Sequence, residues 1–159
     1  MIVIGYQGIG KSSLAGRNNR FIDLESGNFW VDGKRADDWY KPYCQIAEHL
    51  SQQGYIVFTS SHEVVRKQLA YSNEEVAVVY PSVELKEEWI DKLKDRYFRT
   101  NLEKDYKALM NAEDRYEENI KELQKYCNNY HVYSLKLTKM DYDLEAALIH
   151  LKNEIEKFW

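Results

Sequence analysis

The chain opens with a short apolar run that leads straight into a glycine-rich turn. Residues 1–4 are uninterruptedly apolar and rich in β-branched side chains, which predicts a buried strand. The next residues read Gly5-Tyr-Gln-Gly-Ile-Gly10-Lys11-Ser12, and residues 11–15 can begin a helix that ends at Gly16. A buried strand joined to a helix by a tight turn favours folds in which strands and helices alternate.

The turn matches the pattern G-x-x-x-x-G-K-[ST], which binds phosphate groups of nucleotides. Glycines let successive backbone N–H groups point at phosphate oxygens. Lys11 can reach the β- and γ-phosphates, and the Ser12 hydroxyl can ligate Mg²⁺. The alternative is a turn that binds nothing, but a lysine at its mouth serves no purpose in a core. We therefore expect ATP and Mg²⁺ as cofactors, with nucleotide contacts from Gly8, Ile9, Gly10, Lys11, Ser12 and Ser13.

Strand and helix patterns alternate along the rest of the chain. Further strands are predicted at 20–24, 55–59, 76–80 and 131–137, and helices at 38–53, 62–70, 84–98, 102–126 and 144–158. Ser61 is the expected N-cap of the helix at 62–70. The pattern predicts one α/β three-layer domain over residues 1–159, with a five-stranded parallel sheet and a long helical lid or hairpin at 84–129.

Composition narrows the class of protein. The 159 residues are 44% hydrophobic and 30% charged, which fits a folded domain better than a disordered or membrane-spanning chain. A net charge of −4 argues against a nucleic-acid partner. No apolar run approaches the roughly 20 residues that a bilayer needs, and the start of the chain lacks a signal-peptide pattern, so we expect a cytoplasmic protein without a membrane partner. Cys44 and Cys127 have no metal-site spacing, which favours free buried thiols over a disulfide.

A phosphate-binding loop serves several classes of enzyme, and the remaining sequence distinguishes among them. A GTPase needs D-x-x-G after its third strand, and the sequence contains no such tetrapeptide. Thr138-Lys-Met-Asp141 imitates the guanine-reading pattern [NT]-K-x-D, but without the other element we interpret it as a loop that packs near the purine. A small kinase fits these observations better.

Four segments carry a family resemblance: GYQGIGKSS, FIDLESGNF, VFTSSHEVVR and YPSVELKEEWIDKLKDRYFR. Together they span much of residues 1–100 and resemble the nucleoside monophosphate kinase and shikimate kinase superfamily, most closely compact phage-borne nucleotide kinases. The resemblance implies a five-stranded parallel sheet, ATP as donor, Mg²⁺, an acceptor pocket between the second and third strands, and a helical lid. It implies phosphoryl transfer from ATP to a nucleoside monophosphate, a deoxynucleotide included.

The resemblance assigns roles to acids and hydroxyls at two strand ends. Asp23 would hold Mg²⁺ together with Ser12, or accept the proton of the acceptor, and Glu25 replaces the second acid of a D-x-D pattern. A loop-capping role is the alternative for Asp23. Ser60, Ser61 and Arg66 follow the third predicted strand and would hold the acceptor, although a capped surface helix with a solvated Arg66 is also compatible with the sequence. That strand lacks the usual aspartate, so metal binding would depend on Ser12, Asp23 and waters.

Basic residues gather at the end of the helix predicted at 84–98. Lys92, Arg96 and Arg99 are spaced to share one helix face. A lid could use Arg96 and Arg99 as catalytic groups beside Lys11 and Asp23, because arginine forks neutralise the oxygens of a transferring phosphoryl group. The competing interpretation is an ordinary salt-bridged surface with the neighbouring acids Asp91, Asp95 and Glu103.

Aromatic residues leave further alternatives open. Trp30, Trp39 and Tyr40 would line the acceptor pocket, where a ring could stack on Trp30, or they would pack in the core. An apolar stripe from Leu102 through Tyr106 to Tyr126, interrupted at Glu113, indicates a helical hairpin or the seam of a homodimer. Two further functions also fit: a kinase of a nucleoside or sugar acid, or a non-catalytic nucleotide-binding protein. The latter is favoured by a segment at 13–19 that is short for the first helix of a kinase.

Overall fold

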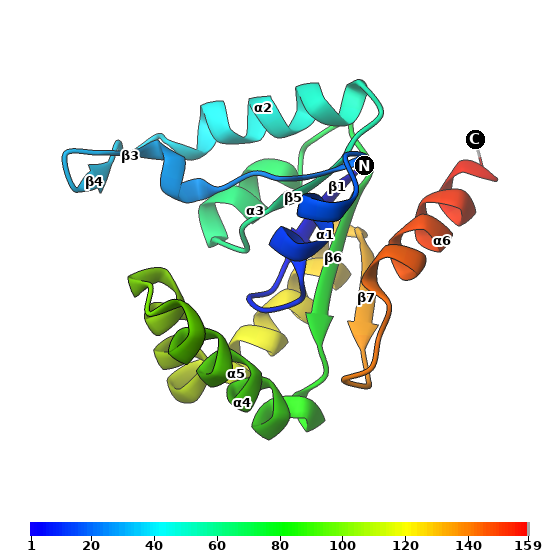
Figure 1. The fold of residues 1–159 in the computed structure, drawn as a ribbon. Helices are drawn as coiled ribbons and strands as arrows, with labels where there is room; N and C mark the ends of the chain where they lie inside the picture. The colour runs from blue at the N-terminus through cyan, green and yellow to red at the C-terminus, as the bar shows by residue number, and fades with distance from the viewer. Residues whose placement is uncertain (159) are drawn as a thin grey trace.

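The computed structural model describes residues 1–158 and contains a five-stranded sheet in which every pairing is parallel (Figure 1). The strand order is β2-β5-β1-β6-β7, so the N-terminal strand lies at the centre. The predicted α/β class and five-stranded parallel sheet are confirmed. The strands are β1 (Ile2–Gly5), β2 (Phe21–Asp23), β5 (Ile56–Thr59), β6 (Val76–Pro81) and β7 (Tyr133–Leu137).

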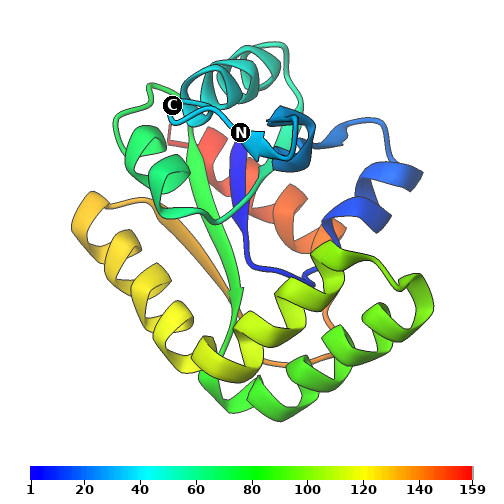
Figure 2. The ribbon, with the colours of Figure 1, turned by 90° about the vertical axis from the view of Figure 1, so that its left-hand side faces the viewer.

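Within residues 1–158, six α-helices surround this sheet on both faces. Figures 1 and 2 show α2, α3 and the C-terminal half of α5 on one face, with α6 on the other. The chain passes from β1 to β2 in one direction along the sheet, and its later crossovers run in the opposite direction. Because each crossover is right-handed, α1 lies on the same face of the sheet as α6. The helices are α1 (Lys11–Arg17), α2 (Tyr40–Gln52), α3 (Glu63–Leu69), α4 (Lys86–Thr100), α5 (Glu103–Tyr130) and α6 (Leu144–Glu156), with 3₁₀ turns at Ser26–Phe29 and Val83–Leu85.

The central strands form the core. Every residue of β1, β5 and β6 is buried, which explains why these segments are continuous apolar runs rather than alternating ones. The edge strand β7 is mostly exposed and buries only Leu137. Among the described residues no helix combines the length and apolarity that a bilayer crossing requires. Cys44 and Cys127 are free and buried, as predicted.

Two short strands were not predicted. β3 (Trp30–Val31) and β4 (Lys34–Arg35) form an antiparallel hairpin around Asp32 and Gly33. Both turn residues have positive φ, 52° and 82°. Asp-Gly is the strongest short signal for such a hairpin, but strands of two residues carry no periodicity to accompany it.

Some predicted boundaries were wrong. Ser61 does not cap α3, because His62 precedes that helix and no side chain caps it. Gly16 lies inside α1 instead of ending it, and Pro81 belongs to β6 instead of stopping it.

Helices α4 and α5 form a hairpin that projects beyond the carboxyl ends of the strands (Figure 2). They meet at Asn101, which has the left-handed φ of 53° that ends α4. Arg115 has non-helical dihedrals (φ −137°, ψ 22°) and divides α5 into two halves. The buried face continues across this kink, and the predicted stripe is confirmed from Leu109 onwards, at Leu109, Tyr116, Ile120 and Leu123. The prediction is wrong at its start, because Leu102 and Tyr106 are about half exposed at 47% and 45%.

Candidate functional site

The topology fixes where a ligand can bind. The chain leaves β1 towards β2 on one side of the sheet, whereas β6 leads to β7 on the other. Such a change of direction opens a crevice outside the carboxyl ends of the strands. The glycine-rich turn after β1 lies at this place, and the α4–α5 hairpin lies across from it (Figure 2).

Glycine is required at two positions of the turn. Gly8 and Gly10 have φ values of 89° and 106°, which side chains rarely tolerate. Gly8 is also closely approached by α4, because a Cβ there would lie 3.0 Å from Leu93 Cδ2 and 3.2 Å from Trp89 Nε1. The turn and the first half of α4 are therefore fitted to each other.

Two side chains fix the direction of the peptide groups in the turn. Trp89 Nε1 donates a hydrogen bond to the carbonyl oxygen of Gln7 (2.8 Å), and the Tyr142 hydroxyl donates to that of Ile9 (2.8 Å). Because a peptide is planar and trans, the N–H groups of the following Gly8 and Gly10 point the opposite way. We name Trp89 and Tyr142 the loop brace; their rings are stacked, with centroids 6.1 Å apart.

Lys92 completes the brace. Its ammonium donates to the Tyr142 hydroxyl (2.7 Å) and lies 4.5 Å from the centroid of the Trp89 ring. Lys92 thus bonds to the loop brace, whereas Arg96 and Arg99 line the cavity on the other side of the turn.

The Lys11 side chain folds back over the turn, where its ammonium donates to the carbonyl oxygen of Gly5 (3.2 Å). Burial lowers the pKa of Lys11, and the nearby carboxylates of Asp23 and Glu25 oppose this shift. A phosphate oxygen that replaced the Gly5 carbonyl would relieve the cost of burying this ammonium.

Ser12 and Asp23 meet as predicted for a metal site. The Ser12 hydroxyl donates to Asp23 Oδ2 (2.8 Å), which brings two hard oxygen donors together at the end of β2. Within residues 1–158 no cluster of three or more His, Cys, Asp or Glu side chains could hold a metal. One carboxylate and one hydroxyl fit Mg²⁺, which keeps several waters and binds phosphate oxygens as well.

A cavity of about 360 Å³, which we name the loop cavity, collects most of the predicted site residues. It lies between the turn, the end of β2 and the hairpin. Ile9, Trp30, Ser61 and Arg66 do not line it. The predicted residues that do are Gly8, Gly10, Lys11, Ser12, Ser13, Asp23, Glu25, Ser60, Arg96 and Arg99.

Buried Asp105 holds Arg96 in the wall of the loop cavity. Arg96 Nε lies 3.0 Å from Asp105 Oδ1, and Asp105 is only 4% exposed. The Thr100 hydroxyl donates to the same carboxylate. Arg96 is therefore ion-paired, although its partner is none of the three acids predicted for the salt-bridged alternative. Across the cavity, Lys104 Nζ lies 3.7 Å from Glu25 Oε1 and links the hairpin to the end of β2.

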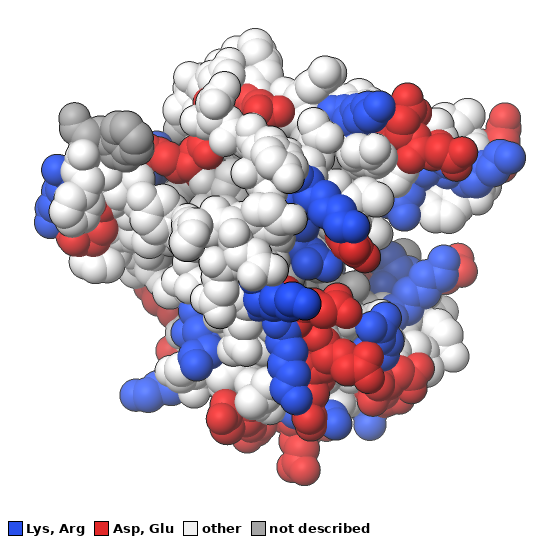
Figure 3. Space-filling view, turned by 180° about the vertical axis from the view of Figure 1, so that it is seen from behind, with Lys and Arg blue, Asp and Glu red and all other residues white. Residues whose placement is uncertain are grey.

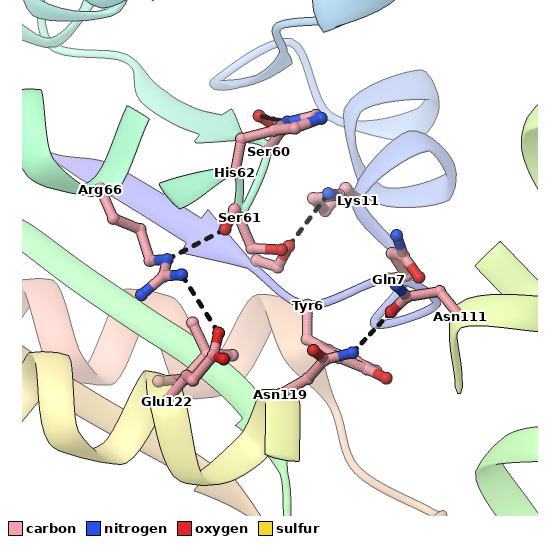
Figure 4. A pocket seen from close by; sticks show the side chains of 12 residues that line it. Tyr6, Gln7, Lys11, Ser60, Ser61, His62, Arg66, Asn111, Asn119 and Glu122 are labelled. Carbon is pink, nitrogen blue, oxygen red and sulfur yellow. Dashed lines mark hydrogen bonds and ion pairs between the residues drawn. The ribbon is translucent and has the colours of Figure 1, made fainter. Parts of the chain in front are cut away.

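A second cavity of about 250 Å³, which we name the side cavity, adjoins the first (Figure 4). Gln7, Lys11, Ser60 and His62 line both cavities. The side cavity also contains Ser61 and Arg66, together with residues from the second half of α5 and its kink region. These are Asn111, Asn119, Glu122 and Leu123.

Arg66 is not a solvated surface residue. Its side chain is 11% exposed, its Nε donates to the carbonyl oxygen of Ser61 (3.0 Å), and its Nη2 lies 3.6 Å from Glu122 Oε2. Its guanidinium also lies over the ring of Tyr126. The positive charge of Arg66 is thus already paired in the wall of the side cavity.

The aromatic residues of the predicted acceptor pocket divide into two groups. Trp39 is 9% exposed and packs edge-on against Tyr43, as the core alternative predicts. Trp30 is 46% exposed and lines a separate groove of about 760 Å³ between the β3–β4 hairpin and α5. The guanidinium of Arg35 lies 4.2 Å from the Trp39 ring centroid and 5.2 Å from that of Trp30.

A further groove of about 630 Å³ lies on the other side of the turn. Gly10 and Ser13 line both this groove and the loop cavity. Met140 and Tyr142 also line it, which places the loop after β7 beside the turn.

Figure 3 shows acidic and basic side chains intermixed over the rear of the molecule.

Comparison with protein-family models finds no match to the chain, and comparison with curated proteins finds no significant match.

Sequence reasoning missed three groups: the loop brace, Asp105 and the Asn111–Asn119 pair. An aromatic residue hydrogen-bonded to a distant carbonyl has no local sequence signature. Asp105 gave a partial signal, since it follows Thr100 and Leu102 near a helix start, where acids are common.

Proposed function

We propose that this chain is an ATP- and Mg²⁺-dependent phosphotransferase that acts on a nucleoside monophosphate, a deoxynucleotide included. The observation that supports this most strongly is the junction of two cavities at Lys11. A phosphoryl transfer needs a donor and an acceptor on either side of the transferring group, with positive charge between them.

The loop cavity and the outer groove suit the donor. The loop brace turns the N–H groups of Gly8 and Gly10 away from the carbonyls that it holds, so they remain for phosphate oxygens. Gly10 and Ser13 border both spaces, so a nucleotide with its phosphates in the loop cavity could place its base beside Met140 in the groove.

The charged residues of the loop cavity suit the reaction. Lys11, Arg96 and Arg99 surround the position of the transferring group, where negative charge spreads over the oxygens. Ser12 and Asp23 would hold Mg²⁺, which supplies charge neutralisation on the phosphate oxygens when it is bound. The side cavity would receive the acceptor, with Ser60 at the boundary between the two.

A coupled assay of ADP release across a panel of nucleoside monophosphates tests this proposal. We expect ADP release that depends on at least one of them. The Lys11→Ala variant should lose about 100- to 1000-fold in kcat, because it removes charge placed at the transferring group. Lys41→Ala, which changes an exposed lysine at the start of α2, is the matched control and should keep full activity. Undiminished turnover in Lys11→Ala would refute the proposal.

Two observations favour a second candidate. Helix α1 has only seven residues, and the Lys11 ammonium is occupied by Gly5. Both features suit a protein that binds nucleotide without turning it over. Tight MgATP binding with no ADP release for any acceptor would support this candidate and contradict the first.

A further inference from the structure

Two buried polar atoms in the side cavity have no hydrogen-bond partner within the described residues: the Tyr6 hydroxyl and Gln7 Oε1. Tyr6 is 2% exposed, and what remains of its surface lines the side cavity. A buried polar group left without a partner is costly, and such groups are rare in folded proteins. An exception of this kind indicates that something outside the chain completes the bonding.

Three other buried tyrosines, which lie on helices, differ from Tyr6. The Tyr43 hydroxyl donates to the Leu24 carbonyl (2.6 Å), that of Tyr116 to the Ser82 carbonyl (2.7 Å), and that of Tyr126 to the Arg66 carbonyl (2.7 Å). Each of these three hydroxyls has a backbone carbonyl as its acceptor. Tyr6 lies edge-on against Tyr116, yet it has no such acceptor.

Carboxamides form the wall that faces these two atoms (Figure 4). Asn119 Nδ2 donates to Asn111 Oδ1, which leaves the carbonyl oxygen of Asn119 and the amino group of Asn111 for a ligand. With Gln7 and Tyr6, the wall offers both donors and acceptors at close quarters.

This wall carries no unpaired charge. Arg66 and Glu122 lie at one end of the side cavity and neutralise each other. Lys11 lies at the opposite boundary, where the loop cavity begins. A phosphate held deep in the side cavity would meet no free cation, whereas an uncharged group rich in donors and acceptors would find partners.

We propose that the side cavity recognises an uncharged hydrogen-bonding group of the acceptor through Tyr6, Gln7, Asn111 and Asn119, and that this group is a nucleobase. The inference rests on the proposed phosphoryl transfer and deepens it. Carboxamides pair with base edges by donating and accepting at once, and a volume of about 250 Å³ can hold one base. The hydroxyls of a sugar offer the same chemistry, and the acceptor panel distinguishes the two sources.

The test is calorimetric titration in the presence of Mg²⁺ and a saturating non-hydrolysable ATP analogue. The acceptors are the five common nucleoside monophosphates, ribose 5-phosphate and gluconate. We expect at least one nucleoside monophosphate to bind about 100-fold more tightly than ribose 5-phosphate, which carries no base. Tight binding of gluconate alone would retain the neutral chemistry but overturn the base assignment. Equal binding of ribose 5-phosphate and all nucleotides would overturn the proposal.

Tyr6→Phe gives the sharper readout, because it separates a ligand role from a structural one. We expect acceptor affinity to fall about tenfold while the Tm stays unchanged or rises, since the variant removes an unsatisfied buried hydroxyl. Tyr116→Phe is the matched control: it breaks a bond to Ser82, so the Tm should fall and acceptor affinity should not change. A Tyr6→Phe protein with a lower Tm and unaltered affinity would refute the proposal.

A second substitution keeps the test independent of Tyr6. Asn111 is exposed, so Asn111→Ala should leave the Tm close to that of the parent while it weakens acceptor binding several-fold. Failure of the ATP analogue to bind would count against the proposed function itself. Normal binding of the analogue with acceptor affinities insensitive to both substitutions would overturn only the inference about the side cavity.

Discussion

The ammonium of Lys11 combines two opposing influences. It is drawn out of water and bonded to the Gly5 carbonyl, while Asp23 and Glu25 lie near enough to favour its charged form. Burial is the stronger influence, so the pKa of Lys11 lies below its ordinary value of 10.5. A bound triphosphate would reverse the balance, because phosphate oxygens stabilise the ammonium.

This balance predicts that the affinity for nucleotide declines at alkaline pH. The affinity for MgATP should be constant below the pKa of Lys11 in the free protein and then decline by up to tenfold per pH unit as the ammonium loses its proton. The decline should begin below pH 10.5 because the pKa is lowered. Titration calorimetry between pH 7 and 10 measures it.

The Lys11→Met variant provides the control for this alkaline decline in affinity. It should bind more weakly at neutral pH and show no decline of this kind. The lowered pKa also has a consequence for stability: between the folded and unfolded pKa values the unfolded chain binds more protons, so the Lys11 contribution to the free energy of unfolding rises with pH. An identical alkaline decline in Lys11→Met would assign the effect to another group.

At the scale of secondary-structure elements, the loop brace connects parts of the chain that are distant in sequence. Trp89 comes from α4 and Tyr142 from the loop before α6, and each holds a different carbonyl of the turn after β1. The turn needs this support because it contains two residues with positive φ and few hydrogen bonds of its own. Its amides are thus oriented before any ligand arrives, which lowers the cost of binding.

We therefore predict that the brace contributes to nucleotide affinity. Trp89→Phe and Tyr142→Phe each remove one donor and keep most of the ring, so the Kd for MgATP should rise about five- to tenfold in each. Equilibrium titration with a fluorescent ATP analogue measures this change. Tyr126→Phe breaks a bond of similar length (2.7 Å) to the Arg66 carbonyl, away from the turn, and should leave the Kd unaltered. If all three variants bound alike, the brace would have only a structural role.

At the scale of the whole molecule, the loop cavity is bordered by three parts of the chain: the turn after β1, the end of β2 and the α4–α5 hairpin. A nucleotide that contacts all three would add to the few bonds that already join them. With a non-hydrolysable ATP analogue at 100 times its Kd, the free energy of unfolding should rise by about 2.7 kcal/mol. For a chain of this size that corresponds to a Tm increase of roughly 5–11 °C.

Hydrogen exchange distinguishes the parts that respond. We expect slower exchange in the turn and also in the hairpin, since Arg96 and Arg99 line the same cavity as Lys11. Arg20 offers a control, because it is exposed and lines neither cavity and neither groove described above: Arg20→Ala should not alter the effect. Protection confined to the turn and α1 would contradict the placement of the arginines on the nucleotide.

The sequence predicted the sheet well because its strands are buried on both faces and read as unbroken apolar runs. It predicted the meeting of Ser12 with Asp23 because parallel strands bring their carboxyl ends to one edge. The brace could not be predicted, since periodicity reports which face of a helix is buried and not which carbonyl a side chain reaches. The phase of α5 was predicted correctly from Leu109 to Leu123, whereas the kink at Arg115 has no signature in the apolar pattern, because the buried positions keep their spacing across it.

The break at Arg115 has a mechanical consequence. Two segments of the chain join the hairpin to the sheet. One leaves β6 at Ser82, and the other returns to the sheet at the break in α5. The Tyr116 hydroxyl connects these two segments, because it donates to the Ser82 carbonyl (2.7 Å). Trp89 of α4 adds a third attachment, because its Nε1 bonds to the Gln7 carbonyl in the turn after β1. Arg96 and Arg99 are therefore held in the wall opposite Lys11 by a hairpin that is tied both to the sheet and to the turn.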